Sequence, residues 1–416
     1  MKVLHLNVSD LYGGASRAAY RLHTGLKNTG VDSKMLVQFK QGMDTDVHRS
    51  VCGPAHSLPK LLRFVDRTPV FLQLKRIETT FHLQWVPDLV LPKIKALNPD
   101  VIHLHWVCGG FVRIESLPKF QKPVVWTLHD MWAFTGGCHL TGDCEKYQQC
   151  CGTCPKLNSS RENDLSRKVW KRKHKTWKEI PLNIVTPSRW LNVCAKKSTI
   201  LKNKKIITIP NGIDLSIYEP TDKIAARKKF KLPLDKKIIL FGAMNAVDDE
   251  NKGFAYFMEA IKRLKENNSI RNCELVIFGI DISTFRVDCN METHLIGWLN
   301  NDDSLAALYS AADVMVVPSK QEAFGQTASE SLACGTPVVA FAGTGLLDIV
   351  EHEHTGYLAI PFDTEDLAKG ILWVIENEER LANLSRKARK KVENEFDLIK
   401  VSKQYAELYH QVQDSL

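Results

Sequence analysis

Residues 318–356 read PSKQEAFGQTASESLACGTPVVAFAGTGLLDIVEHEHTG, and they set Glu322 and Glu330 eight positions apart across a predicted loop-to-helix junction. An apolar strand pattern at 337–341 and a glycine-rich turn at 343–345 follow. A strand end, a tight loop and a helix start in succession place backbone N–H groups where they can receive an anion. The two carboxylates would face the neutral, hydroxyl-rich part of the same ligand. The stretch therefore predicts a site for a nucleotide or a nucleotide-sugar.

The length and composition of the chain indicate a two-domain globular protein. Its 416 residues are too many for one ordinary core, and 44% of them are apolar while 25% are charged. No run of about 18 apolar residues occurs, and the opening MKVLHLNVSD lacks a secretory signal, so we expect a cytoplasmic protein. The net charge of +9 favours an anionic partner such as a phosphorylated ligand or a membrane surface. No nucleic-acid motif is present, so we expect no nucleic-acid partner.

The chain opens with a strand, a glycine loop and a helix. A strand pattern at residues 2–8 leads to Gly13 and Gly14, and apolar residues at helical spacing follow. This order is typical of the first unit of a doubly wound sheet. The two glycines let a ligand approach the backbone, although a tight turn without a ligand explains them equally well. The dinucleotide fingerprint GxGxxG is absent, which argues against a nicotinamide enzyme.

Two buried-strand patterns follow, DVIHLHW at 100–106 and PVVWTL at 123–128. The second delivers His129 and Asp130 at its C-terminal end, where open α/β sheets bind ligands. Histidines are more often packing residues, but Asp130 could orient this one. His129 is therefore a candidate site residue.

Two segments of the first half mix basic and apolar side chains. Residues 58–97 place arginine and lysine among leucine, phenylalanine and valine, including Leu74, Lys75 and Arg76, and residues 161–178 form a strongly basic helix with two tryptophans. Packed helices with solvated charges are the favoured interpretation. A peripheral contact with the inner face of an anionic membrane is the alternative.

A cysteine-rich insert at 137–155, GCHLTGDCEKYQQCCGTCP, interrupts this pattern. Four thiolates in one short loop could close a tetrahedral zinc site, and the most natural set is Cys138, Cys144, Cys151 and Cys154, with Cys150 or His139 as substitutes. A redox-sensitive loop or cysteines packed as small apolar residues are the alternatives. Structural zinc is favoured because a loop with so little apolar content has few other ways to stay ordered.

The second half starts a new series of strands and helices. A strand pattern at 237–242 leads through a loop to Lys252 and Gly253, and the ammonium of Lys252 could reach a diphosphate there. Further strand patterns indicate a second parallel sheet with right-handed crossovers. We predict an N-terminal domain at 1–200, which carries the insert, and a C-terminal domain at 201–394. The helix of about residues 395–416 can pack back on the first domain.

These motifs together resemble those of the retaining glycosyltransferases of family 4. The resemblance rests on EAFGQTASE with its E-x7-E spacing, ESLACGTPVVA, PNGID at 210–214, the Lys252–Gly253 pair, the glycine loop and His129. It covers nearly the whole chain and implies the α/β fold called GT-B, with two Rossmann-like doubly wound domains facing across a cleft. The cysteine loop after HDMWAFTGGC resembles a branch that serves bacterial surface-polysaccharide synthesis.

The resemblance implies a role for each motif residue. Glu322 would meet the hydroxyls of the donor sugar, and Glu330 would hold the ribose hydroxyls. Lys252 would neutralise the leaving diphosphate, His129 would touch the sugar near the reacting carbon, and Gly14 would let acceptor or phosphate approach. The remaining donor-binding residues would be Gly13, Arg17, Phe324, Gly325 and Gln326.

One position departs from the family pattern. The family has an arginine about six residues before the lysine, and Ala246 stands there in this sequence. Arg17, Asn245 or Asn251 would then share the diphosphate charge. The resemblance also implies retention of configuration without a bound divalent metal, and no Asp-x-Asp motif is present to hold one.

We therefore expect a retaining glycosyltransferase that moves a sugar, a hexose by the resemblance, from a nucleotide-sugar to a glycan or lipid-linked acceptor in polysaccharide biosynthesis. A non-catalytic, zinc-stabilised scaffold that binds nucleotide or membrane is the alternative from another class. A GT-B epimerase is the alternative within enzymes. The two glutamates look like ligand holders rather than the paired carboxylates of a retaining glycosidase, which stand about 5 Å apart.

Overall fold

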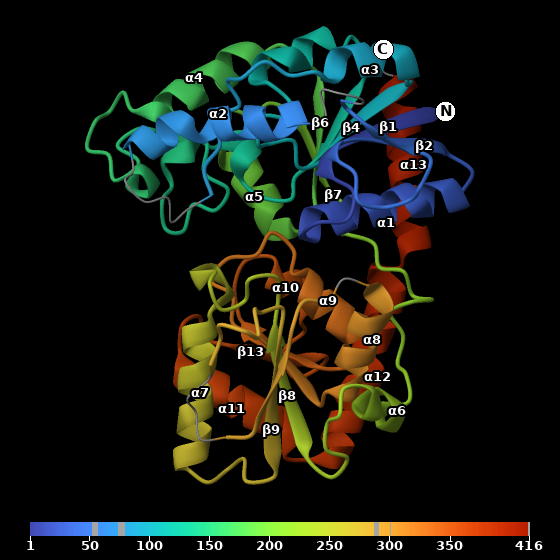
Figure 1. Ribbon diagram of the computed structural model, residues 1–416, viewed down its shortest axis with the longest axis vertical. Helices are drawn as coiled ribbons and strands as arrows, with labels where there is room; N and C mark the ends of the chain where they lie inside the picture. The colour runs from blue at the N-terminus through green and yellow to red at the C-terminus, as the bar shows by residue number, and fades with distance from the viewer. Residues whose placement is uncertain (52–56, 74–79, 287–290, 300, 415–416) are drawn as a thin grey trace. The chain divides into compact units, whose positions relative to one another are not determined.

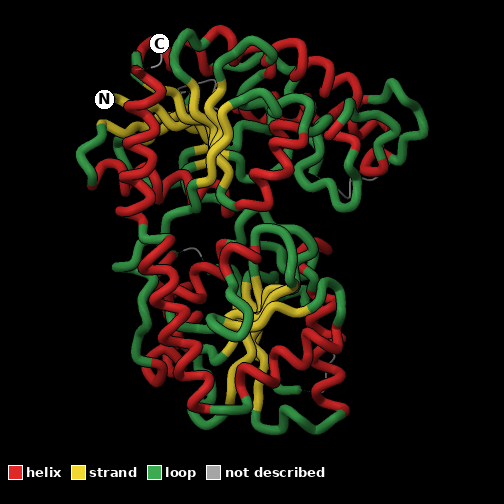
Figure 2. The backbone as a smooth tube through the Cα atoms, turned by 180° about the vertical axis from the view of Figure 1, so that it is seen from behind, coloured by secondary structure: helices red, strands yellow, loops and turns green. Residues whose placement is uncertain are grey.

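The computed structural model describes residues 1–51, 57–73, 80–286, 291–299 and 301–414, which form two compact units (Figure 1). The first unit comprises Met1–Gly212 and Ile399–Leu416, and the second comprises Ile213–Leu398. Each unit is a parallel sheet covered by helices on both faces (Figure 2), as the GT-B fold requires of each of its domains. The two units are described one at a time below.

The first unit contains a seven-stranded parallel sheet of order β3-β2-β1-β4-β5-β6-β7. Its strands are β1 (Lys2–Ser9), β2 (Asp32–Phe39), β3 (Val47–Arg49), β4 (Val101–Leu104), β5 (Val124–Thr127), β6 (Leu182–Thr186) and β7 (Lys205–Thr208). The α-helices in its long segment are α1 (Gly14–Asn28), α2 (Leu58–Gln73), α3 (Val90–Leu97), α4 (Leu165–Trp177) and α5 (Arg189–Lys197). The predicted boundary at residue 200 falls before β7, which pairs with β6, so it has to move to Gly212.

Helix α13 (Leu398–Asp414) completes the core of the first unit after the chain has passed through the second. Its apolar face, with Val401, Leu408 and Val412, packs in one cluster with Val3 of β1 and Val101 of β4. Figure 1 shows this helix beside β1 and α1. The cluster explains why the last residues belong to the first unit.

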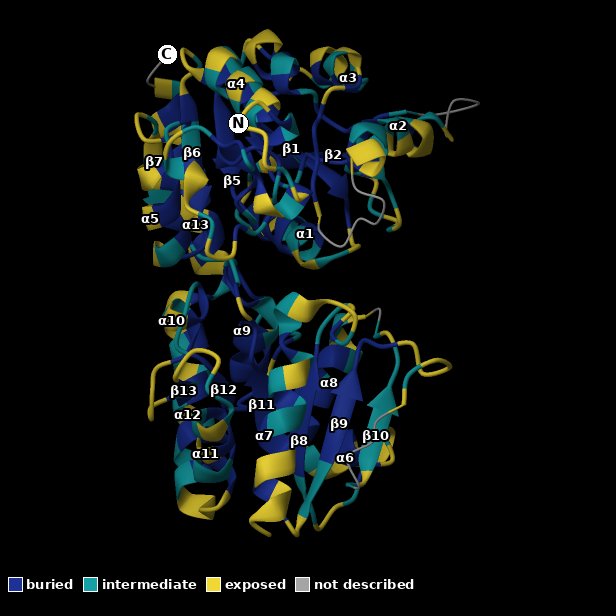
Figure 3. Cartoon of the chain, turned by 90° about the vertical axis from the view of Figure 1, so that its left-hand side faces the viewer, coloured by how far each residue is buried: buried dark blue, intermediate teal, exposed yellow. Residues whose placement is uncertain are grey.

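The second unit contains a six-stranded parallel sheet of order β10-β9-β8-β11-β12-β13. Its strands are β8 (Lys237–Gly242), β9 (Cys273–Phe278), β10 (Thr293–Ile296), β11 (Val314–Val317), β12 (Val338–Phe341) and β13 (Gly356–Ala359). Its helices are α6 (Lys223–Lys229), α7 (Phe254–Glu266), α8 (Asp302–Ala311), α9 (Gln326–Ala333), α10 (Leu346–Ile349), α11 (Thr364–Ile375) and α12 (Glu378–Glu395). The central strands β11 and β12 are buried throughout (Figure 3) because helices cover both faces of the sheet.

The strand order locates the ligand-binding edge of each unit. Both sheets follow the order 3-2-1-4-5-6 of doubly wound folds, so the direction of winding reverses between β1 and β4 in the first unit and between β8 and β11 in the second. Ligands bind such sheets outside the carboxyl ends of the strands at this switch point. The loops after β8 and β11, and those after β1 and β4, are therefore the places to look for a site.

Candidate functional site

Lys252 and Glu322 meet at the switch point of the second unit. Lys252 ends a short 3₁₀ turn after β8, Glu322 follows β11, and the Nζ and Oε1 atoms are 2.7 Å apart. Burial lowers the pKa of Lys252, but the charge and hydrogen bond of Glu322 outweigh burial, and the net pKa is raised. Lys252 is thus a firmly protonated ammonium at the place where this fold receives anions.

Gly253 makes this meeting possible. Its φ of 75° is left-handed, and a Cβ atom there would lie 2.0 Å from the carbonyl oxygen of Pro318 at the end of β11. Two hydrogen bonds also join the loop after β8 to the loop after β11. The backbone N–H of Lys320 donates to the Asn251 carbonyl at 2.8 Å, and the side-chain amide of Asn251 donates to the Gln321 carbonyl at 2.8 Å. The glycine of the Lys-Gly pair is therefore required by a close backbone approach.

The glycine-rich turn 343–345 holds the backbone of Glu322. Glu322 N–H donates to Thr344 Oγ1 at 3.0 Å, and Gly345 N–H donates to the Glu322 carbonyl at 2.9 Å. A Cβ atom at Gly345 would lie 2.7 Å from the Ala323 carbonyl oxygen. The carboxylate of Glu322 is thus carried on a loop fixed from both sides.

Phe324, Gly325 and Gln326 form the junction that leads into α9. Phe324 is buried and its ring packs edge-to-face on Phe396, with the centroids 5.5 Å apart, so its side chain belongs to the core and its backbone alone can reach a ligand. Gly325 has a φ of 112° and caps α9 without a side chain, and Gln326 is the first helical residue. A Cβ atom at Gly325 would lie 2.7 Å from Leu346 Cδ2, so the junction also requires a glycine for packing.

Glu330 lies on the buried face of α9. The Tyr309 hydroxyl donates to Glu330 Oε2 at 3.1 Å, and burial together with Glu330 raises the pKa of Tyr309 well above its usual value. Tyr309 is a neighbour of Glu330 that the sequence pattern did not indicate, because none of the motifs includes it. Ala246, at the position of the family arginine, is fully buried in the core and supplies no charge.

The first unit brings its glycine loop to the ends of β1 and β4. Gly13, with a φ of 93°, precedes α1, on which Gly14 and Arg17 lie. The Asn7 side chain joins the two strand ends, since it donates to Ser16 Oγ at 2.9 Å and accepts from the Trp106 N–H at 2.9 Å. The glycine loop is therefore held at the switch point of this sheet.

His129 is held by other histidines. His105 Nδ1 lies 3.0 Å from His129 Nε2, and His5 Nδ1 lies 2.9 Å from His105 Nε2. Burial lowers the pKa of His129 to about 4 and holds those of His105 and His5 well below the usual range. All three rings are consequently neutral at physiological pH.

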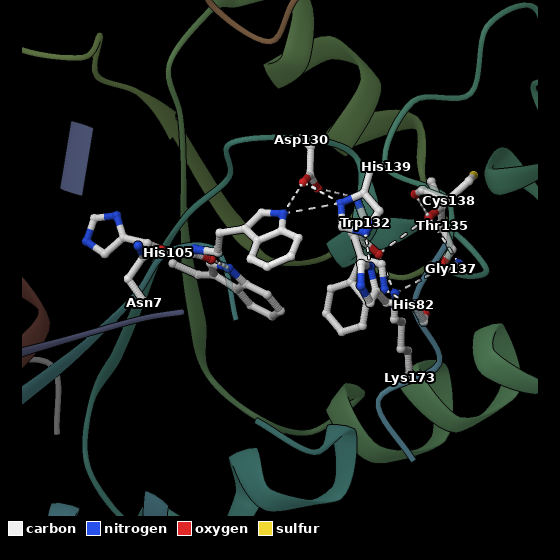
Figure 4. Close-up of polar contacts among 12 residues, drawn as sticks. Asn7, His82, His105, Asp130, Trp132, Thr135, Gly137, Cys138, His139 and Lys173 are labelled. Atoms are coloured by element: carbon white, nitrogen blue, oxygen red, sulfur yellow. Dashed lines mark hydrogen bonds and ion pairs between the residues drawn. The ribbon is translucent and has the colours of Figure 1, made fainter. Parts of the chain in front are cut away.

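The expectation that Asp130 orients His129 is wrong. The Asp130 carboxylate accepts from Trp106 Nε1 at 2.9 Å and from the Trp132 N–H at 2.8 Å, and it binds His139 Nδ1 at 2.6 Å (Figure 4). His139 in turn lies 2.8 Å from His82 Nδ1. Asp130 therefore orders the start of the cysteine-rich insert.

Lys173 is an exception to the interpretation of the basic helix as a solvated face, which holds for the exposed Lys168, Lys171, Lys175 and Lys178. Its ammonium is fully buried, donates to the carbonyls of Trp132 and Thr135, and lies 3.5 Å from the centre of the Trp132 ring. Burial lowers its pKa to about 7. The buried residues of α4, Ser166, Val169, Lys173 and Trp177, are spaced as one helical face, so the spacing itself could have indicated this position.

The four predicted zinc ligands line one cavity in the first unit. Cys138, Cys144, Cys151 and Cys154 surround a space of about 20 Å³, which Cys150 does not line. Burial raises the pKa of Cys138 to about 12 and that of Cys151 to about 11. Their sulfurs stand further apart than in a closed site. Within the described residues, the groups of three ligand atoms all within 4.8 Å of one another are His5–His103–His105 and His82–Cys108–His139.

Known proteins resemble this chain in both halves. A family model described as Glycosyltransferase Family 4 matches residues 12–217, and one described as Glycosyl transferases group 1 matches residues 222–391. N-acetyl-alpha-D-glucosaminyl L-malate synthase of Bacillus anthracis is 26% identical over 216 residues, which cover 50% of this chain and 55% of that protein. The match thus spans little more than half of that curated relative.

Solved structures resemble the chain over its full length. Sucrose-phosphate synthase from Thermosynechococcus elongatus has a TM-score of 0.72 at 21% identity and covers 100% of both chains. Anabaena HepE in complex with UDP and glucose has a TM-score of 0.64 at 16% identity and covers 99% of this chain and 100% of that one. At these identities the likeness establishes the fold.

Proposed function

Because the chain belongs to the family 4 glycosyltransferases with the GT-B fold, we propose that it transfers a sugar from a nucleotide-sugar to a glycan or lipid-linked acceptor, with retention of configuration. The observation that carries this proposal is the Lys252–Glu322 pair at the switch point of the second sheet. A nucleotide-sugar presents a diphosphate beside a polyhydroxylated ring, and this pair offers a cation and a hydrogen-bond acceptor together. UDP and glucose in the HepE structure support a nucleotide-sugar as donor.

The proposed reaction leaves the chain's own residues with binding and charge stabilisation. The bond between the sugar C1 and the diphosphate oxygen breaks, the acceptor oxygen bonds to C1 on the same face, and the acceptor proton passes to a diphosphate oxygen. Lys252 stabilises the negative charge of the departing diphosphate. Glu322 accepts from sugar hydroxyls, and Glu330, held by Tyr309, accepts from the ribose hydroxyls.

The test is release of nucleoside diphosphate from a panel of nucleotide-sugars, with and without oligosaccharide acceptors. We expect Glu322→Gln and Lys252→Met to lower turnover by about 100-fold, as removal of one charge-stabilising group typically does. Glu266→Gln is the matched control, since Glu266 is exposed at the far end of the helix that begins after Lys252. Absence of turnover with every donor, or turnover that both site variants leave unchanged, would refute the proposal.

Polysaccharide biosynthesis adds a membrane-bound acceptor to the proposal, and helix α2 suits such a setting. It exposes Leu61 (56%), Phe64 (65%) and Leu72 (84%), and the Arg67 guanidinium lies 5.3 Å from the centre of the Phe71 ring, while Val70 on the opposite face is buried. Leu74, Lys75 and Arg76 lie outside the described residues. Within the part of the chain that the structure describes, no helix has the length and hydropathy to cross a bilayer. We propose that α2 rests on an anionic lipid surface.

Sedimentation with vesicles tests the lipid contact. The native chain should bind vesicles that contain phosphatidylglycerol more tightly than vesicles of phosphatidylcholine alone. Phe64→Ser should weaken this binding, whereas Met43→Ser, at another highly exposed position of the first unit, should not. Equal binding to both vesicle types, or equal binding by both variants, would remove the lipid contact from the proposal.

The insert supports a second proposal, a structural zinc ion held by Cys138, Cys144, Cys151 and Cys154. These thiols, and not Cys150, line one cavity, and burial together with neighbouring thiols raises the pKa values of Cys138, Cys151 and Cys154. A zinc ion would convert the mutual repulsion of thiolates into attraction and draw the sulfurs to about 2.3 Å from the metal.

Metal analysis of protein purified without added zinc should find one zinc per chain. Cys151→Ser should lose the metal and Cys150→Ser should keep it. Metal-free native protein would refute the proposal.

A further inference from the structure

Three imidazole rings from different parts of the first sheet form a hydrogen-bonded series that ends at His129. His5 lies on β1, His105 directly follows β4, and His129 follows β5, so three strands deliver them to one layer. The pairing of β1 with β4 places His5 beside His103, two residues before His105. Stacking accompanies the hydrogen bonds, because the ring centroids are 5.2 Å apart for His5 and His105 and 5.3 Å apart for His105 and His129.

Proton counting leaves two arrangements for this series. A neutral imidazole carries one N–H and one bare nitrogen, and each N···N hydrogen bond needs one proton. Either the Nδ1 atoms of all three rings are protonated, or the Nε2 atoms of all three are. The tautomer of His5 therefore determines whether Nδ1 of His129, the ring nitrogen outside the series, carries a proton.

The surroundings of His5, at the buried end of the series, decide between these two proton arrangements. His5 Nε2 is buried and has no hydrogen-bond partner among the described residues. A proton there would create an orphaned buried N–H, which folded proteins avoid more strictly than an unused acceptor. His5 is therefore protonated at Nδ1, and the same holds in turn for His105 and His129.

Neighbouring polar groups do not disturb this order. The ring of His103, tilted by 35° to that of His105 with the centroids 4.2 Å apart, is hydrogen-bonded to the Tyr409 hydroxyl at 2.6 Å and to Thr127 Oγ1 at 2.7 Å. Asp130, the charged group nearest to His129, is committed to His139 and two tryptophans. Nδ1 of His129 has no bonded partner within the described part of the chain and is not among the buried unpaired atoms.

We propose that His5 and His105 are positioning residues that fix the tautomer of His129, so that His129 offers its Nδ1–H to a substrate hydroxyl as a donor and does not act as a general base. The role toward substrate rests on the proposed function, whereas the tautomer does not. A low pKa of about 4 for His129 agrees with a ring that stays neutral and can keep its single proton on Nδ1.

The decisive experiment is two-bond ¹H–¹⁵N NMR of the full chain labelled with ¹⁵N-histidine, which separates protonated from bare ring nitrogens. The signals of His129 are assigned by their loss in His129→Gln. We expect a protonated Nδ1 and a bare Nε2 from pH 6 to pH 8. A protonated Nε2, a mixture of tautomers or a charged ring would overturn the proposal.

Two variants of His5 test the positioning role. His5→Asp presents only acceptor atoms to His105 Nε2 and should switch His129 to the Nε2 tautomer, whereas His5→Asn keeps an N–H near the position of Nδ1 and should preserve the native tautomer. His103→Leu is the matched control, because it removes a buried ring outside the series and should leave His129 unchanged. If His5→Asp does not fold, the native spectrum and His5→Asn still decide. A native tautomer of His129 in His5→Asp would overturn the positioning role.

Kinetics separate the inference from the proposed function. His5→Asp should lower kcat about 10-fold, the loss of about one hydrogen bond, with KM for the donor unchanged, and His5→Asn should keep most of the native kcat. An unchanged kcat in a folded His5→Asp variant that has switched tautomer would overturn the donor role of His129. Absence of transfer with any donor would refute the proposed function and leave the NMR assignment standing.

Discussion

Replacement of Gly253 by alanine tests the backbone approach on which the Lys252–Glu322 pair depends. The φ of Gly253 is 75°, and a Cβ atom there would lie 2.0 Å from the oxygen and 2.8 Å from the carbon of the Pro318 carbonyl group. Both obstacles are backbone atoms at the end of the buried strand β11. Neither can move aside as a flexible side chain would.

The cost has two parts that can be worked out from this geometry. A left-handed conformation costs an L-residue about 1–2 kcal/mol, and an added methyl group in a packed interior costs about 1–3 kcal/mol. The lower entropy of the unfolded chain returns about 0.4–1 kcal/mol. We expect Gly253→Ala to lower the free energy of unfolding of the second unit by about 2–4 kcal/mol.

Urea unfolding of three variants separates the two parts. Gly30→Ala keeps the left-handed strain, with a φ of 85°, but meets no atom within 4 Å, and it should cost only about 1 kcal/mol. Gly343→Ala has neither a left-handed φ nor a neighbour within 4 Å and should be nearly neutral. Because the units can unfold separately, each variant is compared with the transition of its own unit. The reasoning is refuted if Gly253→Ala costs no more than Gly30→Ala.

Other predictions follow from the charged and hydrogen-bonded groups of the second unit. Since the pKa of Lys252 is raised above its usual 10.5, the stability that its pair with Glu322 adds is fully present below pH 10.5 and is lost as the pH rises through the raised value. The difference in unfolding free energy between native protein and Lys252→Met should therefore be constant from pH 6 to pH 9 and shrink above 10.5, and shrinkage near pH 7 would contradict this assignment. Tyr309→Phe should cost about 1–3 kcal/mol in urea unfolding, because buried Glu330 loses a donor, and should weaken nucleotide binding in a thermal-shift assay. Asp313→Ala should cost about 3–5 kcal/mol, since it removes the carboxylate that lies 2.7 Å from Nη2 of the buried guanidinium of Arg227, and a loss below 1 kcal/mol would show that the backbone carbonyls that also accept from this guanidinium compensate for its charge.

The fold was predictable from the sequence because parallel strands buried on both faces give unbroken apolar runs. DVIHLHW, KIILFG and DVMVVP all proved to contain strands of the two sheets, and the order of strands and helices indicated doubly wound units. The place of α13 was harder to predict. Its apolar repeat shows that one face is buried, but both sheets offer an apolar surface, and the packing with Val3 and Val101 is a contact between distant segments.

The candidate site was predictable where a motif is local and less so where partners are distant. Lys252 with Gly253 and the Glu322 loop are recognisable because backbone geometry demands glycines at fixed positions. The partner of His129 was predicted wrongly, because Asp130 is its neighbour in sequence whereas His105 reaches it across strands. Strand pairing brought these side chains together, and no spacing along the chain records that pairing.

The return of the chain to the first unit has a consequence for biosynthesis. On the ribosome, residues 1–212 emerge first, but their core lacks α13 until residues 399–414 have been translated. Until then, buried His103 and Thr127 lack the hydroxyls of Tyr409 and Tyr405. A premature stop codon just before α13 would release a chain whose second unit is complete and whose first is not. The first unit can therefore close only after α13 has left the ribosome.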